Sequence, residues 1–160
     1  MEDKKEIKED KQYMDLALKE AKKAYHKDEV PIGAVVVREG KILGRGYNLR
    51  EKKQDPTAHA EMTAIRQASA ALKSWRLEDC TLYVTLEPCP MCAGAMLQAR
   101  IKRVVYGTTD PKGGAVDTLY SLLQDSRFNH QVEVKSGVKA EKSRQLLQEF
   151  FQNLRKRKDG

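Results

Sequence analysis

The chain has 160 residues, of which 40% are hydrophobic and 33% charged, and an excess of Lys and Arg gives a net charge of +7 at pH 7. This length suits one domain with a single hydrophobic core. No apolar stretch approaches the roughly 18 residues of a membrane-spanning helix, and the mixed composition excludes collagen-like and low-complexity chains. The positive charge is compatible with a polyanionic partner, but equally with an ordinary basic cytosolic protein.

The N-terminal segment carries charges of both signs and no apolar core, so it lacks the features of a secretory signal. We therefore expect a cytoplasmic protein whose residues 1–9 are flexible. Over residues 10–26 apolar side chains recur at helical spacing, which predicts an amphipathic helix that ends before Pro31. These side chains are Met14, Leu18, Ala21 and Tyr25.

Residues 32–47 have the pattern of a β-hairpin. Residues 32–37 are apolar and rich in β-branched side chains, Glu39-Gly40 is a turn pair, and residues 41–47 resume an extended pattern. A second helix is then predicted over residues 58–72.

An alternation of strand and helix follows. Residues 81–86 predict a strand, residues 90–99 a helix and residues 104–106 another strand. Because a helix of about ten residues separates the two strands, we expect them to pair in parallel through a crossover. Residues 108–129 are less regular, and a short strand is expected at residues 132–134.

The last predicted element is a helix that begins near Ala140. An apolar stripe runs along it, and its strongly basic end predicts a frayed tail at residues 155–160. The stripe consists of Leu147, Phe150, Phe151 and Leu154. Because no internal repeat or flexible linker divides the sequence, we predict one α/β domain over residues 1–160.

The three cysteines are Cys80, Cys89 and Cys92. An odd number of cysteines without a secretion signal argues against a disulfide framework and favours a metal or catalytic use of the close pair. Cys89 and Cys92 stand at the start of a predicted helix, where residues three apart share one face and the helix dipole favours thiolates. Cys80 is the spare cysteine.

His59 and Glu61 stand at the start of another predicted helix. Two thiolates and one imidazole would leave a tetrahedral zinc ion one vacant position, as in catalytic sites. Because the thiolates neutralise the ion's charge, water bound there would be less acidic than in an all-histidine site, and we predict that Glu61 serves as its base. The alternatives are half of a structural zinc knuckle or two buried small hydrophobes, but His26 and His130 lack ligand-like spacing for a fourth position.

The segments His59-Ala60-Glu61 and Pro88-Cys89-Pro90-Met91-Cys92 resemble the signature of the zinc-dependent nucleobase and nucleoside deaminases. Three longer segments resemble the bacterial tRNA-specific adenosine deaminases, within the cytidine and deoxycytidylate deaminase superfamily. The resemblance covers about residues 13–151. The longer segments are Val30 to Val35, Asp55 to Glu61 and Thr81 to Cys89.

This resemblance implies a three-layer α/β/α fold, with a five-stranded mixed sheet flanked by helices, and a homodimer. It implies that His59, Cys89 and Cys92 hold one zinc ion per subunit, that Glu61 shuttles protons, and that no organic cofactor takes part. The implied reaction is the hydrolytic deamination of adenosine to inosine at the wobble position of a tRNA anticodon stem-loop.

Two further residues match positions that approach RNA in the family. Asn48, at the end of the second predicted strand, matches the residue that hydrogen-bonds the target base, although a turn Asn is the alternative interpretation. Asp110 lies in a loop that approaches the neighbouring nucleotides, with an ordinary Asp-Pro turn as its alternative.

The predicted C-terminal helix carries a concentrated basic charge, with seven Lys and Arg against three Asp and Glu from Lys139 onward. Such residues contact phosphates, and an exposed aromatic ring stacks on a splayed base. Phe150 and Phe151 are adjacent, so we expect one to pack inward and Phe151 to face RNA. The alternative is that both are core residues and the tail only aids solubility.

Two other functions compete with a tRNA deaminase. A guanine or other free nucleobase deaminase would use the same zinc site, but its small neutral substrate has no need of a basic C-terminal helix. A non-catalytic, zinc-stabilised tRNA-binding module would have no use for Glu61 beside the metal.

Overall fold

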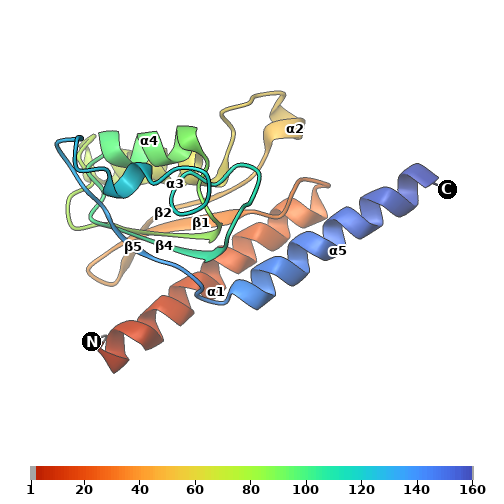
Figure 1. The fold of residues 1–160 in the computed structure, drawn as a ribbon, viewed down its shortest axis with the longest axis horizontal. Helices are drawn as coiled ribbons and strands as arrows, with labels where there is room; N and C mark the ends of the chain where they lie inside the picture. The colour runs from red at the N-terminus through yellow and green to blue at the C-terminus, as the bar shows by residue number, and fades with distance from the viewer. Residues whose placement is uncertain (1–2, 160) are drawn as a thin grey trace.

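A five-stranded mixed sheet lies between two layers of helices in the computed structural model, which describes residues 3–159 (Figure 1). The strand order is β2-β1-β3-β4-β5, with β1 antiparallel to β2 and β3, and β4 parallel to β3 and β5. The predicted α/β/α class, hairpin and parallel crossover are therefore confirmed. The strands are β1 (Gly33–Arg38), β2 (Lys41–Tyr47), β3 (Thr81–Leu86), β4 (Arg103–Thr108) and β5 (Glu133–Lys135).

Long helices cover both faces of the sheet. On one face lie α1 (Lys4–His26) and α5 (Ala140–Asp159), and on the other α3 (Ala60–Leu72) and α4 (Pro90–Gln98). The sequence pattern missed α2 (Arg50–Lys53) and the 3₁₀ helix η1 (Leu122–Gln124), because such short turns show no hydrophobic periodicity. Within residues 3–159, no helix has the length and apolar character needed to span a membrane.

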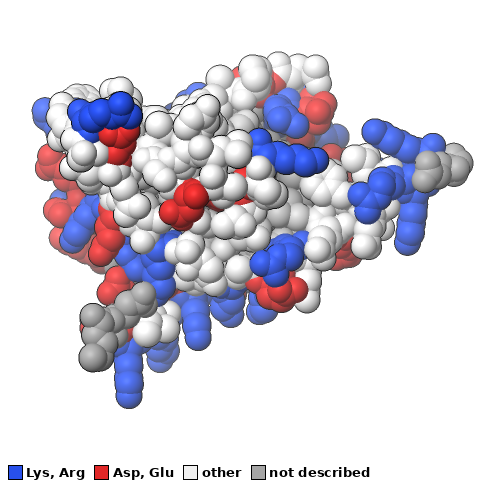
Figure 2. Space-filling model, viewed as in Figure 1, with Lys and Arg blue, Asp and Glu red and all other residues white. Residues whose placement is uncertain are grey.

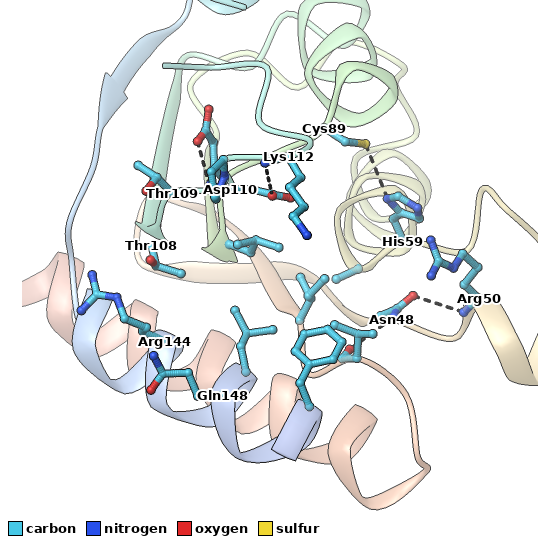
Figure 3. Close-up of a pocket in the computed structure, with 18 of the residues that line it drawn as sticks. Asn48, Arg50, His59, Cys89, Thr108, Thr109, Asp110, Lys112, Arg144 and Gln148 are labelled. Atoms are coloured by element: carbon cyan, nitrogen blue, oxygen red, sulfur yellow. Dashed lines mark hydrogen bonds between the residues drawn. The ribbon is translucent and has the colours of Figure 1, made fainter. Parts of the chain in front are cut away.

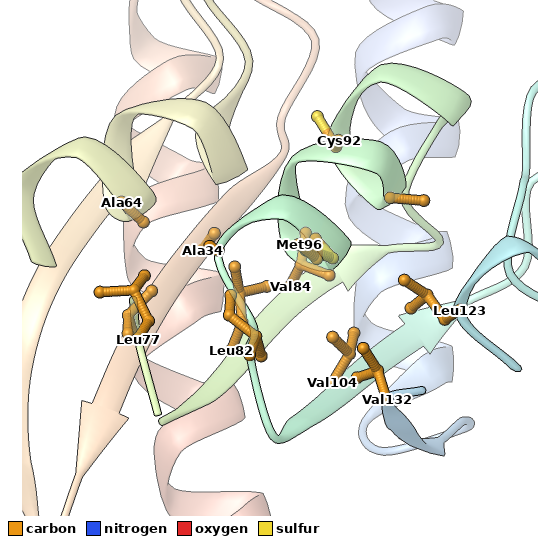
Figure 4. Packing of buried hydrophobic residues seen from close by; sticks show 14 of the residues in the cluster. Ala34, Ala64, Leu77, Leu82, Val84, Cys92, Met96, Val104, Leu123 and Val132 are labelled. Atoms are coloured by element: carbon orange, nitrogen blue, oxygen red, sulfur yellow. The ribbon is translucent and has the colours of Figure 1, made fainter. Parts of the chain in front are cut away.

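Alternate residues of the central strands form two separate cores, as expected for a sheet that is covered on both faces. Leu82, Val84 and Val104 belong to the larger core, in which Met96 of α4 packs over the sheet (Figure 4). The smaller core lies against α1 and consists of Met14, Ala17, Val35, Val37, Tyr83, Val105 and Val138.

Two glycines let β2 approach the first turns of α3 closely. A Cβ atom at Gly44 would lie 2.1 Å from the carbonyl oxygen of Ala64, and one at Gly46 would lie 2.2 Å from that of Ala60. No other residue fits these positions without moving the helix. The start of α3, which carries His59 and Glu61, is thereby fixed against the sheet.

The predicted start of the first helix at residue 10 needs correction, because α1 begins at Lys4. The flexibility expected for residues 1–9 stays a prediction. Asp3 caps the helix by accepting a hydrogen bond from the Lys5 N–H at 3.1 Å, and Glu6 forms an ion pair with Arg103 at 2.9 Å. These polar contacts order a helical turn that carries no apolar periodicity. Residues 1 and 2 lie outside the described residues.

Asp10 anchors α1 to the sheet. Its buried carboxylate accepts hydrogen bonds from both Nη atoms of Arg103 at 2.8 Å, from the Tyr83 hydroxyl at 2.8 Å and from Nζ of Lys135 at 3.0 Å. Burial acts to raise the pKa of Asp10, but the hydrogen bonds from Arg103, Tyr83 and Lys135 outweigh it and lower the pKa below 3.8.

The last helix, α5, continues to Asp159, and the fraying expected for residues 155–160 stays a prediction. Arg157 pairs with Asp28 at 3.1 Å, and Asn153 donates a hydrogen bond to the Tyr25 hydroxyl at 2.6 Å. Basic residues in the last turn also suit the negative end of the helix dipole. Residue 160 lies outside the described residues.

Candidate active site

The starts of α3 and α4 bring three potential metal ligands together. His59 is the N-cap of α3 and Cys89 the N-cap of α4, while Pro90 occupies the first turn of α4, where no N–H is needed. Nδ1 of His59 lies 3.6 Å from Sγ of Cys89 and 3.5 Å from Sγ of Cys92. The sequence therefore predicted this cluster correctly as a spatial group.

The geometry of this group fits a zinc ion. At a tetrahedral angle, Zn–S bonds of about 2.3 Å and Zn–N bonds of about 2.0 Å place sulfur and nitrogen about 3.5 Å apart. The three donor atoms lie within 4.8 Å of one another. Within the described part of the chain this is the group of His, Cys and acidic residues that could hold a metal, and buried Cys80 is not part of it.

The surroundings of Cys89 favour a thiolate, which is the form that binds metals. The pKa of Cys89 is lowered to about 4, chiefly by a hydrogen bond from the side chain of Cys92 and then by one from His59. The hydrogen bond with Cys89 in turn raises the pKa of His59.

Glu61 lies in the first turn of α3, beside His59 and at the cavity wall, and is 4% exposed. Burial raises its pKa to about 7. A carboxyl group with such a pKa can both accept and donate a proton near neutral pH. Glu61 therefore offers, next to the metal-ligand group, a carboxyl group that is suited to general acid–base catalysis.

A cavity of about 1170 Å³ lies between these helix starts and α5 (Figure 3). His59 and Cys89 form one side of it, whereas Arg144 and Gln148 line it from α5. Arg50 and Lys112 lie at its edges. Its remaining lining includes Val30, Ile32, Asn48, Thr108, Thr109, Asp110, Leu147, Phe151, Gln152 and Arg155.

Asn48 lines the cavity directly after β2 and is 5% exposed. Its Nδ2 donates to the Val30 carbonyl at 3.2 Å, and its Oδ1 accepts from the Arg50 N–H at 3.2 Å. The side chain therefore stabilises a turn, as the alternative interpretation expected. A carboxamide has further donor and acceptor capacity, so this turn also orients a hydrogen-bonding group in the cavity.

Asp110 also stabilises a turn and lines the cavity. Its Oδ1 accepts the N–H groups of Lys112 and Gly113, each at 3.1 Å, and its carbonyl accepts the Gly114 N–H at 2.9 Å. The expected Asp-Pro turn is therefore present, and it carries Lys112 to the edge of the cavity.

Phe150 and Phe151 differ in exposure as predicted. Phe150 is 5% exposed and packs edge-on against Tyr25, with ring centroids 5.9 Å apart. Phe151 is 39% exposed and lines the cavity. The expectation that both are core residues is wrong.

Sequence reasoning missed two buried carboxylates, Glu29 and Glu87, which accept hydrogen bonds from segments that contribute residues to the cavity lining. Glu29 accepts the N–H groups of Glu51 and Lys52 at 3.0 and 2.6 Å, next to Arg50. Glu87 accepts hydrogen bonds from the loop that begins at Asp110. The sequence did offer a signal for Glu87, because it is a charged residue directly after a buried strand. Arg144 and Gln148 could not be distinguished in the sequence from residues on a solvent-exposed helix face.

Comparisons with known proteins agree with this fold. The MafB19-like deaminase family matches residues 8–155. A Bacillus subtilis tRNA-specific adenosine deaminase is 58% identical over 94% of this chain and 93% of its own. A solved structure from a study of A-to-I editing by tRNA:A34 deaminases at the wobble position of transfer RNA is 46% identical, with a TM-score of 0.81, covering 85% of this chain and 99% of that one.

A guanine deaminase structure from Bacillus subtilis is also similar, at 42% identity and a TM-score of 0.58, but it covers 61% of this chain and 63% of its own. The adenosine deaminase relatives match over a greater length, including 95% of this chain for a Streptococcus pyogenes protein at 48% identity. This chain therefore belongs to the MafB19-like deaminase family, together with the tRNA-specific adenosine deaminases.

Proposed function

We propose that this protein is a zinc-dependent enzyme that hydrolyses adenosine to inosine and ammonia at the wobble position of a tRNA anticodon. The single observation that carries the proposal is the cavity in which His59 and Cys89, two members of the metal-ligand group, face the basic and aromatic side chains of α5. The long match to tRNA-specific adenosine deaminases supports the same substrate.

One zinc ion per chain is proposed to bind to His59, Cys89 and Cys92. Three protein ligands leave a tetrahedral zinc ion one open position, at which it would supply Lewis acidity to activate water. The donor distances and the low pKa of Cys89 support this assignment. No organic cofactor is part of the proposal.

Glu61 is proposed to move the protons of the reaction. It accepts a proton from the attacking water and delivers it to N1 of adenine. It then takes the second proton from the hydroxyl group now bonded to C6 and passes it to the departing amino group, which leaves as ammonia while the C6 carbonyl forms. Its burial and its pKa of about 7 suit both directions of transfer. Asn48 is proposed to hydrogen-bond the target base, since its carboxamide already has a set orientation.

The substrate is proposed to be an anticodon stem-loop rather than a free base. The cavity exceeds the roughly 300–1,000 Å³ of ordinary small-molecule sites. Arg50, Lys112, Arg144 and Arg155 surround it with positive charge, and Phe151 offers a face for base stacking. Lys and Arg also gather around the C-terminal end of α5 (Figure 2). We propose that Asp110 and Phe151 contact nucleotides beside the target.

Incubation of the purified protein with bulk tRNA, followed by nucleoside analysis, tests this function. Inosine should appear, and an anticodon stem-loop with an unpaired adenosine should also react, because a looped-out base is cheap to insert. Free guanine should be a poor substrate, since it cannot use the binding energy of the loop and phosphates. Efficient guanine turnover without inosine in tRNA would favour the guanine deaminase alternative.

A homodimer in the cytoplasm completes the proposal. Leu119, Tyr120 and Phe128 are 45–61% exposed in the segment between β4 and β5, which supports a protein contact there. Sedimentation equilibrium should give twice the chain mass, and Tyr120→Glu should shift the protein toward monomer. A parent protein that sediments as a monomer at micromolar concentration would contradict the dimer.

A further inference from the structure

Glu87 is a buried carboxylate that the proposed reaction does not use. It follows the last residue of β3, directly precedes Pro88 and Cys89, and is 2% exposed. The loop of residues 110–118 donates five hydrogen bonds to it. Oε1 accepts from the Asp110 N–H at 3.0 Å and from the Thr118 hydroxyl, and Oε2 accepts from the N–H groups of Val116, Asp117 and Thr118 at 3.1, 2.8 and 3.0 Å.

The loop closes tightly around this carboxylate. A Cβ atom at Gly114 would lie 2.3 Å from Cδ of Glu87, so the loop backbone passes directly beside the carboxyl group. The Ala115 N–H also donates to the Pro88 carbonyl at 2.9 Å. Glu87 thus joins both ends of the loop to the chain segment that carries Cys89.

The position of the loop matters because Asp110 and Lys112 stand at the cavity edge. Hydrogen bonds from backbone N–H groups to a carboxylate are charge-assisted and stronger than neutral ones. Cys89 is only two residues beyond Glu87 along the chain. The same side chain therefore sets where the loop lies relative to the metal-ligand group.

We propose that Glu87 is a positioning residue for substrate recognition, which holds the loop of residues 110–118 so that Lys112 meets an RNA phosphate while the target base reaches the metal-ligand group. This inference rests on the proposed function and deepens it. A contact made equally in the bound and transition states acts mainly on KM. Loss of Glu87 should therefore weaken RNA binding more than it slows the chemical step.

The first test is Glu87→Gln in the full-length, zinc-loaded protein. Glutamine has a similar size but presents NH₂ to N–H donors in place of one acceptor oxygen. KM for an anticodon stem-loop should rise at least about tenfold while kcat stays within about threefold. The amides of residue 110 and residues 116–118 should exchange hydrogen at least about tenfold faster, and zinc should remain at one ion per chain.

Glu29→Gln is the matched control, because Glu29 is also buried and accepts backbone N–H groups, from Glu51 and Lys52, which are not in the loop of residues 110–118. Combined with Lys112→Ala, Glu87→Gln should raise KM by much less than the product of the two single effects, since Lys112 is already misplaced. Glu29→Gln should combine with Lys112→Ala multiplicatively, as independent sites do. A purely structural role for Glu87 would give the multiplicative result with both.

Three results would overturn the proposal. They are a parental KM despite faster loop exchange, loss of zinc in Glu87→Gln, and independent effects of Glu87→Gln and Lys112→Ala. If Glu87→Gln fails to fold, Gly114→Ala attacks the same contact from the loop side and should raise KM similarly. Exchange and zinc content need no substrate, so failure of the parent protein to form inosine would instead refute the proposed function.

Discussion

The two sides of the cavity are built in different ways. On one side, the starts of α3 and α4 hold His59, Cys89 and Cys92 within 4.8 Å of one another, next to a buried Glu61. On the other side, α5 presents exposed Arg144, Gln148, Phe151 and Arg155 over several turns. The comparison teaches that the chemical groups occupy a small rigid area, whereas binding is distributed over a large exposed one. Substitutions on the first side should therefore abolish activity, whereas substitutions on the second side should each weaken RNA binding by a small amount.

The largest effect is expected from removing a metal-ligating thiolate. Cys89→Ala or Cys92→Ala should lose zinc and activity together, because two remaining ligands cannot hold a catalytic ion. Elemental analysis and inosine formation measure the two losses. Cys80→Ala is the matched control and should keep both, and a Cys92→Ala protein with its full zinc content would refute the ligand assignment.

Glu61→Ala should produce the second largest effect. Its zinc content and tRNA affinity should persist, while the single-turnover rate falls by at least the ~10²–10⁴ of general acid–base catalysis. Activity within about tenfold of the parent would remove Glu61 from proton transfer.

Asn48→Ala should have an intermediate effect. We expect kcat/KM for the stem-loop to fall about 10- to 100-fold, because a buried base contact and the turn that holds it are lost together. Zinc analysis should be unchanged. An unaltered kcat/KM would mean that Asn48 only supports its turn with Val30 and Arg50.

A smaller, graded effect is expected on α5. Arg155→Ala should lower the slope of log affinity against log salt by about 0.7–0.9, the value for one phosphate contact. Lys19→Ala, an exposed change on α1 away from the cavity lining, should leave the slope unchanged. Deleting residues 155–160 should flatten the slope further and raise KM without changing zinc content. Equal slopes for parent and deletion would contradict an RNA contact by α5.

Asp10, remote from both sides, should have the smallest effect on catalysis. Asp10→Asn should lower the free energy of unfolding by about 1–3 kcal/mol at pH 7, since Arg103 loses its buried partner but keeps its ion pairs with Glu6 and Glu133, and KM should not change. Because the folded pKa of Asp10 is lowered, its stabilisation is complete above the ordinary pKa of 3.8 and is lost as the pH falls through the folded value. Urea unfolding at pH 7 and pH 3 should therefore show a smaller acid-induced loss in the variant.

Much of the fold could be predicted because its elements have strong local patterns. The hairpin, β3, α4 and β4 have hydrophobic periods or β-branched runs that match their burial. The pattern placed the start of α1 six residues too late, because residues 4–9 are ordered by polar contacts such as Glu6 with Arg103. Polar contacts across long sequence distances leave no periodic signal.

The sequence by itself determined the chemistry of the site. His59 and Glu61 stand in one short motif and Cys89 and Cys92 in another, each at a helix start, and the three-residue spacing of the cysteines places them on one helix face. Only the tertiary structure decided that the two motifs meet, that α5 faces them, and that Glu87 holds the loop of residues 110–118. The physical reason is that residue types and their spacing within a motif are local, whereas the approach of His59 to Cys89, 30 residues away, and the assembly of a binding surface with its buried supports depend on how whole layers pack across the sheet.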